Sequence, residues 1–228
     1  MRKIKKIISA LIVFITIIII VRVFVGETCH IPSPSMESTI MTGDFLWINK
    51  AVYGAKLPVC FADIPLVNIF TWIPFLREAD LKNNWGYHRF PGFQKPRIKD
   101  VVVFNSIENA TILLVKRIHS IVYKGSPVDL NLDNYEMIKT IVERDGNILT
   151  LQNDSIYING KFQSIYTPQQ NYYYMLADNP KNSYDSRNYG YIPESHIVGK
   201  ASIALWSIDK EQGGFNKIRK DRFLHRIQ

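Results

Sequence analysis

The chain has 228 residues, of which 46% are hydrophobic, and its net charge is +8 with a pI near 9.4. This length and apolar content indicate one folded domain with a substantial core and exclude a disordered polypeptide. The positive charge raises the question of nucleic acid, but no zinc-finger, RRM-like or basic-helix pattern accompanies it. We therefore exclude a nucleic-acid partner and attribute the charge to attraction by anionic lipid headgroups.

The N-terminal segment predicts a membrane anchor. Residues 1–6 carry four cations, and residues 7–25 are then almost continuously apolar. As a helix this run is long enough to cross ~30 Å of hydrocarbon, with Arg22 near one end able to reach the headgroups. A cleaved secretory signal is the rival interpretation, but the apolar run is unusually long and no small-x-small site follows it. We therefore predict a cytoplasmic segment at 1–6, a transmembrane anchor at 7–25 and an extracytoplasmic domain at 26–228.

The chain contains two cysteines, Cys29 and Cys60. They could form a bridge outside the cytoplasm, but two thiols are no disulfide framework, and the sequence leaves their state open. No Cys/His spacing typical of a metal site is present, so we expect neither a metal nor another cofactor.

A Ser/Pro-rich stretch, residues 31–44, follows the anchor and is the most distinctive part of the chain. Pro32 and Pro34 fix their own φ and keep their predecessors extended, so Ser33 and Ser35 lie on stiff backbone. A hydroxyl held in this way can be aimed at a partner. On this stretch alone, a linker leaving the membrane is the alternative interpretation.

The next residues predict antiparallel strands around an irregular insertion. Residues 44–53, 100–104 and 110–123 are rich in β-branched and aromatic side chains and are bounded by turn residues. Residues 56–99 alternate proline with large apolar groups and show no clean period, so we expect an irregular insertion. Its Trp and Phe side chains could lie either on the domain core or in the membrane interface, and the sequence favours neither.

Lys116 lies inside the strand-like run at 110–123. Strand alternation places it on the same face as Ile112, Leu114 and Ile118, with Arg117 on the opposite face. A lysine at a strand end that extends to solvent is the ordinary interpretation. The alternative is a desolvated lysine with a lowered pKa, as a general base requires.

The second half of the chain also reads as β structure. We expect one hairpin from residues 138–144 and 147–152 around Asp145-Gly146, and another from 155–158 and 161–165 around Asn159-Gly160. Two further strands are expected at 172–176 and 197–208, separated by a polar loop at 177–190. The basic tail at 215–227 has apolar residues at roughly helical spacing, which suggests a short surface helix near the bilayer.

Taken in order, these motifs resemble those of the type I signal peptidases, a family of membrane-anchored Ser/Lys endopeptidases that remove signal peptides from exported proteins. The resemblance spans residues 22 to about 206. It is carried by Ser35-Met36 with Thr39 nearby, Gly43-Asp44, residues 100–104, Val115-Lys116-Arg117, and the loop from Asp178 to Gly190.

The resemblance implies a role for each matching position. Ser35 would be the nucleophile and Lys116 the general base, while the Ser33 hydroxyl and the Ser35 backbone N–H would form the oxyanion hole. Ser183 would orient Lys116. Other positions implied as supporting are Asp178, Asp185 and Arg187, and those expected to bind substrate are Pro34, Met36, Leu114 and Val115.

These roles imply a mainly β, antiparallel ectodomain that cuts secretory preproteins after small-x-small sites. The enzyme would lie in the cytoplasmic membrane of a bacterium, with its N-terminus inside and its catalytic domain outside. An extended substrate between residues 32–36 and 112–116 would gain backbone hydrogen bonds as an added strand. Arg117 is expected not to matter for proton transfer, so its replacement by lysine should leave most activity.

The chain departs from the family pattern at several positions. The family usually has Pro where Ser38 stands, and Gly where Lys99 and Ala177 stand, and none of these changes removes a catalytic atom. Two alternative functions therefore stay open: a dedicated maturation peptidase for a narrow pilin- or conjugation-type substrate set, and a catalytically silent, membrane-tethered β module that binds exported chains.

Overall fold

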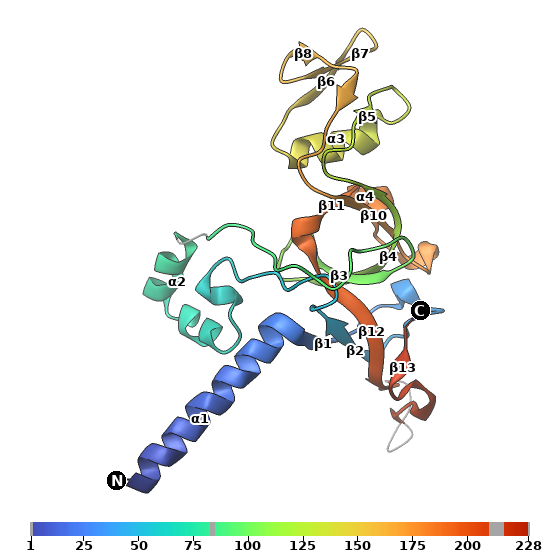
Figure 1. Cartoon of the computed structure of the whole chain (residues 1–228). Helices are drawn as coiled ribbons and strands as arrows, with labels where there is room; N and C mark the ends of the chain where they lie inside the picture. The colour runs from blue at the N-terminus through green and yellow to red at the C-terminus, as the bar shows by residue number, and fades with distance from the viewer. Residues whose placement is uncertain (1, 83–84, 210–216, 228) are drawn as a thin grey trace.

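The computed structural model describes residues 2–82, 85–209 and 217–227. A long N-terminal helix leads into a central sheet, which carries a helical insertion beside the helix and a small lobe at the opposite end (Figure 1).

An N-terminal helix lies where the sequence predicts the membrane anchor. It comprises α1 (Arg2–Ile20) and a π-helical continuation, η1 (Val21–Val25). Within the described ranges it is the one helix whose length and apolar composition suit a membrane span. The helix projects away from the rest of the molecule (Figure 1). Nearly all of its side chains are exposed. The predicted span at 7–25 therefore lies within one continuous helix that begins five residues earlier.

The helix passes directly into the sheet. Strand β1 (Gly26–His30) begins at the residue that follows η1, and it pairs antiparallel with β2 (Asp44–Asn49). The Lys50 ammonium donates a hydrogen bond to the Arg22 carbonyl at 3.0 Å and forms an ion pair with Glu27 at 3.0 Å. Arg22 itself pairs with Glu27 at 3.3 Å. These contacts fasten the end of the helix to the first two strands.

The central sheet has eight strands and every pairing in it is antiparallel. Its order is β1-β2-β12-β3-β4-β10-β11, with β13 paired to β12. This confirms the mainly β, antiparallel fold class. The strands not yet bounded are β3 (Val101–Asn105), β4 (Leu113–Val122), β10 (Tyr172–Leu176), β11 (Ile192–Pro193), β12 (Ile197–Ser207) and β13 (His225–Arg226).

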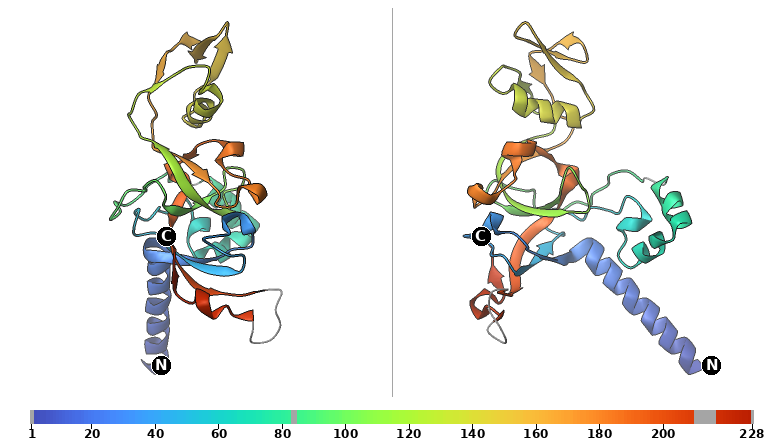
Figure 2. Two further views of the ribbon diagram at one scale, coloured as in Figure 1. Left: turned by 90° about the vertical axis from the view of Figure 1, so that its right-hand side faces the viewer. Right: turned by 180° about the vertical axis from the view of Figure 1, so that it is seen from behind.

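Alternating apolar side chains explain why the sheet buries one face. In β2, Leu46 and Ile48 are fully buried, while the alternate residues Phe45, Trp47 and Asn49 are partly exposed. The long strand β12 bends where its register shifts against β2 and β3, so the sheet curves (Figure 2). Gly43 precedes β2 with φ +94°, and a Cβ there would lie 2.0 Å from the Ile208 carbonyl oxygen, so the turn requires glycine.

The small lobe corrects one sequence prediction. Residues 138–144 are not a strand but belong to α3 (Tyr135–Arg144), and Asp145-Gly146 ends this helix instead of turning a hairpin. Ile138, Ile141 and Val142 are buried on one side of α3, which is the i, i+3, i+4 spacing of an amphipathic helix.

The rest of the lobe is β structure, as expected. Asn159 and Gly160 both have positive φ, which confirms the second hairpin turn. The lobe's strands are β5 (Val128–Asp129), β6 (Leu149–Gln152), β7 (Ser155–Ile158), β8 (Lys161–Phe162) and β9 (Ile165–Tyr166). They form two small sheets, β5-β9 and β6-β7-β8.

The described part of the insertion contains three short helices: η3 (Phe61–Asp63), η4 (Val67–Trp72) and α2 (Pro74–Leu81). The irregular character of residues 56–99 is as expected, although helix α2 was not predicted. Its large side chains do not pack on the domain core, because Trp72, Phe75 and Phe93 are 83%, 76% and 87% exposed. Of the two placements left open by the sequence, seating these side chains on the core is therefore wrong.

The C-terminal tail also differs from its prediction. Residues 217–227 form a short 3-10 turn, η8 (Lys220–Arg222), and strand β13 in place of a surface helix, and residues 215–216 lie outside the described ranges. Arg222 and Ile227 are buried, so the tail packs against the sheet. The apparent helical spacing therefore did not reflect a helix.

Candidate active site

Ser35 and Lys116 lie side by side although 81 residues separate them in the sequence. Ser35 occupies a single 3-10 turn, η2 (Pro34–Met36), and Lys116 lies within β4. The Lys116 Nζ donates a hydrogen bond to the Ser35 Oγ at 2.9 Å. The two residues are only 3% and 8% exposed, so the contact is shielded from solvent. The structure thus joins the two residues that the sequence assigned to nucleophile and base.

Burial changes the protonation of Lys116. Desolvation lowers its pKa from 10.5 to about 8, because a low-dielectric surrounding disfavours the ammonium form. The negative charges of Asp185 and Asp178 oppose this shift, and the positive charge of Arg187 adds to it. A substantial fraction of the amine is therefore neutral in the weakly alkaline range and can accept a proton.

A second hydroxyl completes the group. The Ser33 Oγ lies 3.3 Å from the Ser35 Oγ. Ser33 has extended backbone and Pro34 opens the 3-10 turn, so Pro34 acts on the local conformation as the sequence indicated. An oxygen that accumulates negative charge near Ser35 would have a hydrogen-bond donor within reach.

Asn179 fixes the backbone on which Ser35 is mounted. Its backbone N–H donates to the Ser35 carbonyl at 3.0 Å, and its side-chain amide donates to the Pro34 carbonyl at 3.2 Å. On the other side, Met36 is 1% exposed and packs into the core with Ile40. Asn179 had no role in the sequence analysis. Its position directly after Asp178 in the polar loop was the available signal.

Asp178 links the lysine strand to the serine segment. Its carboxylate accepts hydrogen bonds from the Arg117 Nε and Nη2 at 2.8 and 2.7 Å and from the Thr39 hydroxyl at 2.7 Å. Arg117 also donates to the Thr39 hydroxyl at 2.9 Å and to the Lys99 carbonyl at 2.9 Å. Arg117 therefore points away from Lys116 and connects the neighbouring segments through Asp178, Thr39 and Lys99.

Asp185 and Arg187 brace the following loop. Asp185 is fully buried, caps the N-terminus of α4 (Ser186–Tyr189), and accepts hydrogen bonds from Arg187 and from the Ala177 N–H. Burial alone would raise the pKa of Asp185, but these hydrogen bonds outweigh it and hold the pKa below its usual value. The carboxylate stays ionised and keeps a negative charge in the neighbourhood of Lys116.

Ser183 does not make its expected contact. Its buried Oγ forms no hydrogen bond with any described residue, Lys116 included. The orienting role assigned to Ser183 therefore stays a prediction that rests on its place in the loop.

The four residues expected to bind substrate differ in exposure. Pro34 and Leu114 are half-buried and border the Ser35–Lys116 pair along the chain, whereas Met36 and Val115 lie in the core at 1% and 8% exposure. The backbones of all four flank the site, but only the first two side chains are accessible.

Two further observations concern metals and thiols. Among the described residues, no three His, Cys, Asp or Glu side chains gather as a metal ion would require. Cys29 and Cys60 are both free thiols in this structure.

Comparison with known proteins gives a consistent result. The family model described as signal peptidase, peptidase S26, matches residues 4–206. Signal peptidase I of Buchnera aphidicola subsp. Schizaphis graminum is 27% identical, covering 86% of this chain and 73% of the relative. The enzyme of the same name from Aquifex aeolicus is 23% identical over 89% and 84%, and that of Pseudomonas aeruginosa 28% identical over 83% and 68%. The chain belongs to the peptidase S26 signal peptidase family.

Proposed function

We propose that this protein removes signal peptides from exported preproteins with Ser35 as nucleophile and Lys116 as general base. The 2.9 Å hydrogen bond between the Lys116 Nζ and the Ser35 Oγ carries the proposal. A serine hydroxyl becomes nucleophilic when a base takes its proton, and a neutral amine serves without histidine. This contact also argues against a catalytically silent β module.

The chemical steps follow from this arrangement. Neutral Lys116 takes the hydroxyl proton while the Ser35 Oγ attacks the scissile carbonyl carbon. The Ser33 hydroxyl and the Ser35 backbone N–H stabilise the resulting oxyanion. Lys116 then gives its proton to the departing amine, and it later activates the water that releases the acyl group from Ser35. Asp178, Asp185 and Arg187 act by holding the surrounding loop, and Ser183 keeps its proposed role of orienting Lys116.

The edge of β4 offers a place for the substrate backbone. Residues 113–116 pair with β3 on one side, whereas β10 begins to pair with β4 only at Arg117. Within the described part of the chain, the other edge of residues 113–116 is therefore open beside Ser35. An extended peptide can add there as a strand, with Pro34 and Leu114 facing its side chains.

We further propose that the substrate carries small residues at the first and third positions before the cut. Alternate side chains of an added strand point into the enzyme, and a larger group in a filled pocket costs about 1 to 3 kcal/mol. This amounts to roughly ten- to a hundredfold slower cleavage.

The proposed location follows from the helix and the relatives. Residues 7–25 span the cytoplasmic membrane of a bacterium, residues 1–6 stay inside, and residues 26–228 form the catalytic domain outside. The cations before the helix favour this orientation, and the relatives named above are bacterial proteins.

The test uses detergent-solubilised full-length protein and a purified preprotein with a small-x-small site. Wild type should produce one cut at that site, and Ser35→Ala should produce none while melting at a similar temperature. A preprotein with Leu at both positions should be cleaved at least tenfold more slowly. Cleavage by folded Ser35→Ala would refute the nucleophile assignment, and an inert wild type would favour the silent module.

A further inference from the structure

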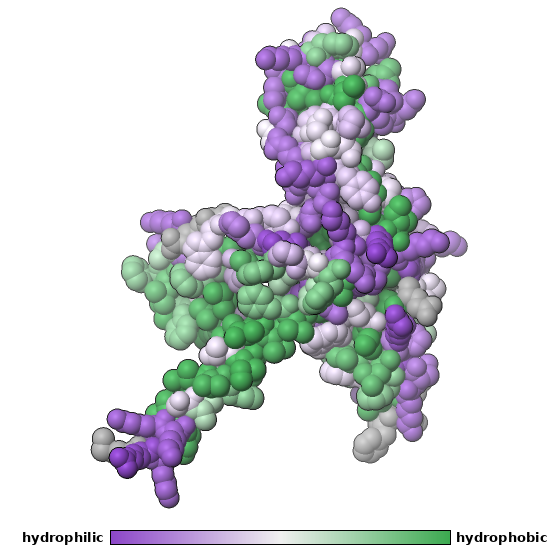
Figure 3. All heavy atoms as spheres, viewed as in Figure 1, coloured by the Kyte–Doolittle hydropathy of each residue, from purple (hydrophilic) through white to green (hydrophobic). Residues whose placement is uncertain are grey.

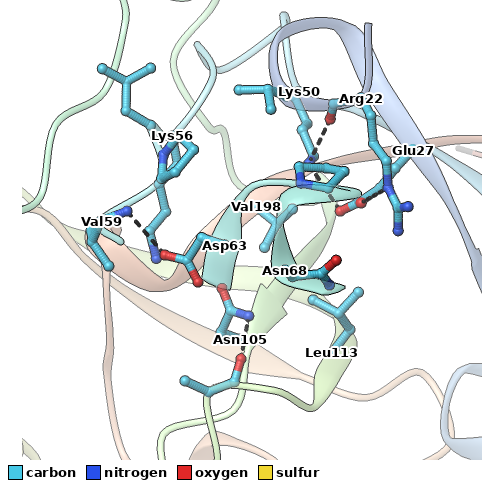
Figure 4. A pocket seen from close by; sticks show the side chains of 15 residues that line it. Arg22, Glu27, Lys50, Lys56, Val59, Asp63, Asn68, Asn105, Leu113 and Val198 are labelled. Atoms are coloured by element: carbon cyan, nitrogen blue, oxygen red, sulfur yellow. Dashed lines mark hydrogen bonds and ion pairs between the residues drawn. The ribbon is translucent and has the colours of Figure 1, made fainter. Parts of the chain in front are cut away.

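A cavity lies beside the end of the N-terminal helix, away from Ser35. It has a volume of about 330 Å³ and is lined by the end of the helix, the start of β1, the residue after β2, the first part of the insertion, the edges of β3 and β4 and the start of β12. Figure 4 shows Arg22, Lys50 and Glu27 grouped on one side of this cavity and Lys56 with Asp63 on the other. Its size is that of a site for a small ligand or a lipid headgroup.

The charges in the cavity are unbalanced. Glu27 is shared between two cations, since it pairs with Arg22 at 3.3 Å and with Lys50 at 3.0 Å. The Asp63 carboxylate accepts a hydrogen bond from the Val59 N–H at 3.0 Å. Three cations thus face two carboxylates that already have partners.

Lys56 is the cation without a direct partner. No described carboxylate lies within ion-pair distance of its ammonium, and no described acceptor forms a hydrogen bond with it. Burial lowers its pKa, Asp63 partly restores it, and Arg89 lowers it further. A half-buried ammonium in this position would be stabilised by an anion entering the cavity.

The cavity adjoins the end of the helix that is long enough to span a membrane. Arg22, one of its walls, is in the last turn of that helix. The insertion beside it exposes Phe70, Trp72 and Phe75 at 61%, 83% and 76%. Figure 3 shows the apolar surface continuing from the helix onto the insertion, while polar residues cover the insertion's opposite side. Aromatic side chains in such a position are typical of the headgroup region.

We propose that this cavity binds the phosphate of an anionic phospholipid headgroup, of the phosphatidylglycerol type, with Lys56 as its direct ligand. The aromatic side chains of the insertion lie at the headgroup level next to it. Lys50 and Arg22 add positive charge on the far wall, and the exposed Asn68 amide at the rim can donate a hydrogen bond. This site is additional to the peptidase activity and requires only that the anchor crosses the membrane.

The experiment titrates full-length protein, in uncharged detergent, with short-chain phosphatidylglycerol and counts bound lipid by native mass spectrometry. Lys56→Gln should weaken binding about tenfold or more, because a charge-assisted hydrogen bond is lost. Lys95→Gln is the matched control: it removes the same charge from an exposed lysine of the same insertion outside the cavity. It should leave the affinity nearly unchanged.

Two further arms identify the ligand. Phosphatidylcholine should bind at least tenfold more weakly than phosphatidylglycerol, and glycerol phosphate without acyl chains should not compete at the same concentration. Equal losses for Lys56→Gln and Lys95→Gln would reveal diffuse attraction and overturn the site, and full competition by glycerol phosphate would overturn the lipid source.

Folding and catalysis are checked separately. Lys56→Met, which keeps the aliphatic stem, should lose lipid binding in the same way as Lys56→Gln, and retained binding would overturn the role of the ammonium. Both variants should cleave a preprotein in lipid-free detergent at the wild-type rate. A loss of lipid binding with cleavage intact is therefore distinct from a failure of the peptidase assignment.

Discussion

Burial of Lys116 determines the pH range in which its amine can accept a proton. With a pKa lowered to about 8, the neutral fraction increases tenfold per pH unit below that value and levels off above it. We therefore expect the cleavage rate, measured between about pH 6 and pH 10, to rise with pH on the acid side and then to level off, in parallel with the neutral fraction of Lys116. Lys116→Arg should abolish cleavage, because guanidinium stays charged. A pH-independent rate, or folded Lys116→Arg that cleaves normally, would exclude Lys116 as the base.

Arg117→Lys is the matched control for that profile. The sequence predicted that most activity would survive, and the structure adds that Arg117 holds Asp178 with two nitrogens of one guanidinium. A lysine cannot make both hydrogen bonds, so we expect a lower maximal rate, while the pH at which the rate rises should not change. A shift of that pH would show that Arg117 acts on proton transfer, contrary to its orientation.

The same burial should make Lys116 lower the free energy of unfolding at neutral pH. Its folded pKa, about 8, lies below the usual 10.5, so between these values the unfolded chain binds more protons than the folded one. The free energy of unfolding therefore increases with pH between these two values. Below about pH 8 the full destabilisation by Lys116 is present. Lys116→Met should raise the free energy of unfolding at pH 7 by up to about 3 kcal/mol and give no gain above about pH 10.5. Urea unfolding at several pH values measures it, and a less stable variant at pH 7 would contradict it.

Lys99 stands where the family usually has glycine, and its φ of +75° explains that preference. Its N–H and carbonyl are bonded to Ile118 and Arg117, so the strained conformation cannot relax. Lys99→Gly should stabilise the fold by about 0.5 to 1 kcal/mol, the relief of strain less the added entropy of the unfolded chain. Thermal melting tests this, with Lys95→Gly as the control, and a lower melting temperature than wild type would argue against strain at this position.

At the scale of elements, the C-terminal segment holds the loop that follows Ser35. Arg222 pairs with the fully buried Asp44 and donates to the Thr39 carbonyl, while Arg219 donates to the Thr42 carbonyl. Arg222→Met should cost about 3 to 5 kcal/mol, because Asp44 is left buried without a counter-charge. The double variant Asp44→Asn with Arg222→Met should recover part of that loss. Urea unfolding curves decide it, and a double variant less stable than Arg222→Met would contradict this account.

Element prediction succeeded where the hydrophobic pattern had one interpretation. The apolar run at 7–25 and the β-branched runs at 100–104 and 172–176 lie in a helix and in strands, as expected. The strand prediction for residues 138–144 was wrong because Ile, Thr and Val favour strands locally, whereas their spacing and the burial of one side favour a helix. Tertiary burial decided this case, and composition alone could not show it.

Site prediction depended on ordered motifs. They identified Ser35 and Lys116, which the fold then brings to hydrogen-bond distance. Asn179 was missed because its contribution comes largely from a backbone N–H, which leaves no mark in residue type. The cavity beside the helix end could not be predicted either, because its walls come from the helix end, the insertion and four strands that only the fold brings together.

At the scale of the whole molecule, orientation is the first property to test. The cations before the helix should keep the N-terminus in the cytoplasm and place the sheet outside. An alkaline phosphatase reporter fused after Gln228 should be active and a fluorescent reporter that folds only in the cytoplasm should be dark. The opposite result would reverse the topology and refute the export function.

The direct passage of the anchor helix into β1, with Lys50 bonded to Arg22 and Glu27, leaves no flexible tether between bilayer and sheet. Ser35 follows on the same short path, so in the anchored molecule it is held at one fixed height above the lipid. If Ser35 is the proposed nucleophile, a signal peptide that spans the same bilayer would reach it only where the peptide chain passes that height. The fixed position of Ser35 would then set the distance between a substrate's apolar segment and its cleavage site.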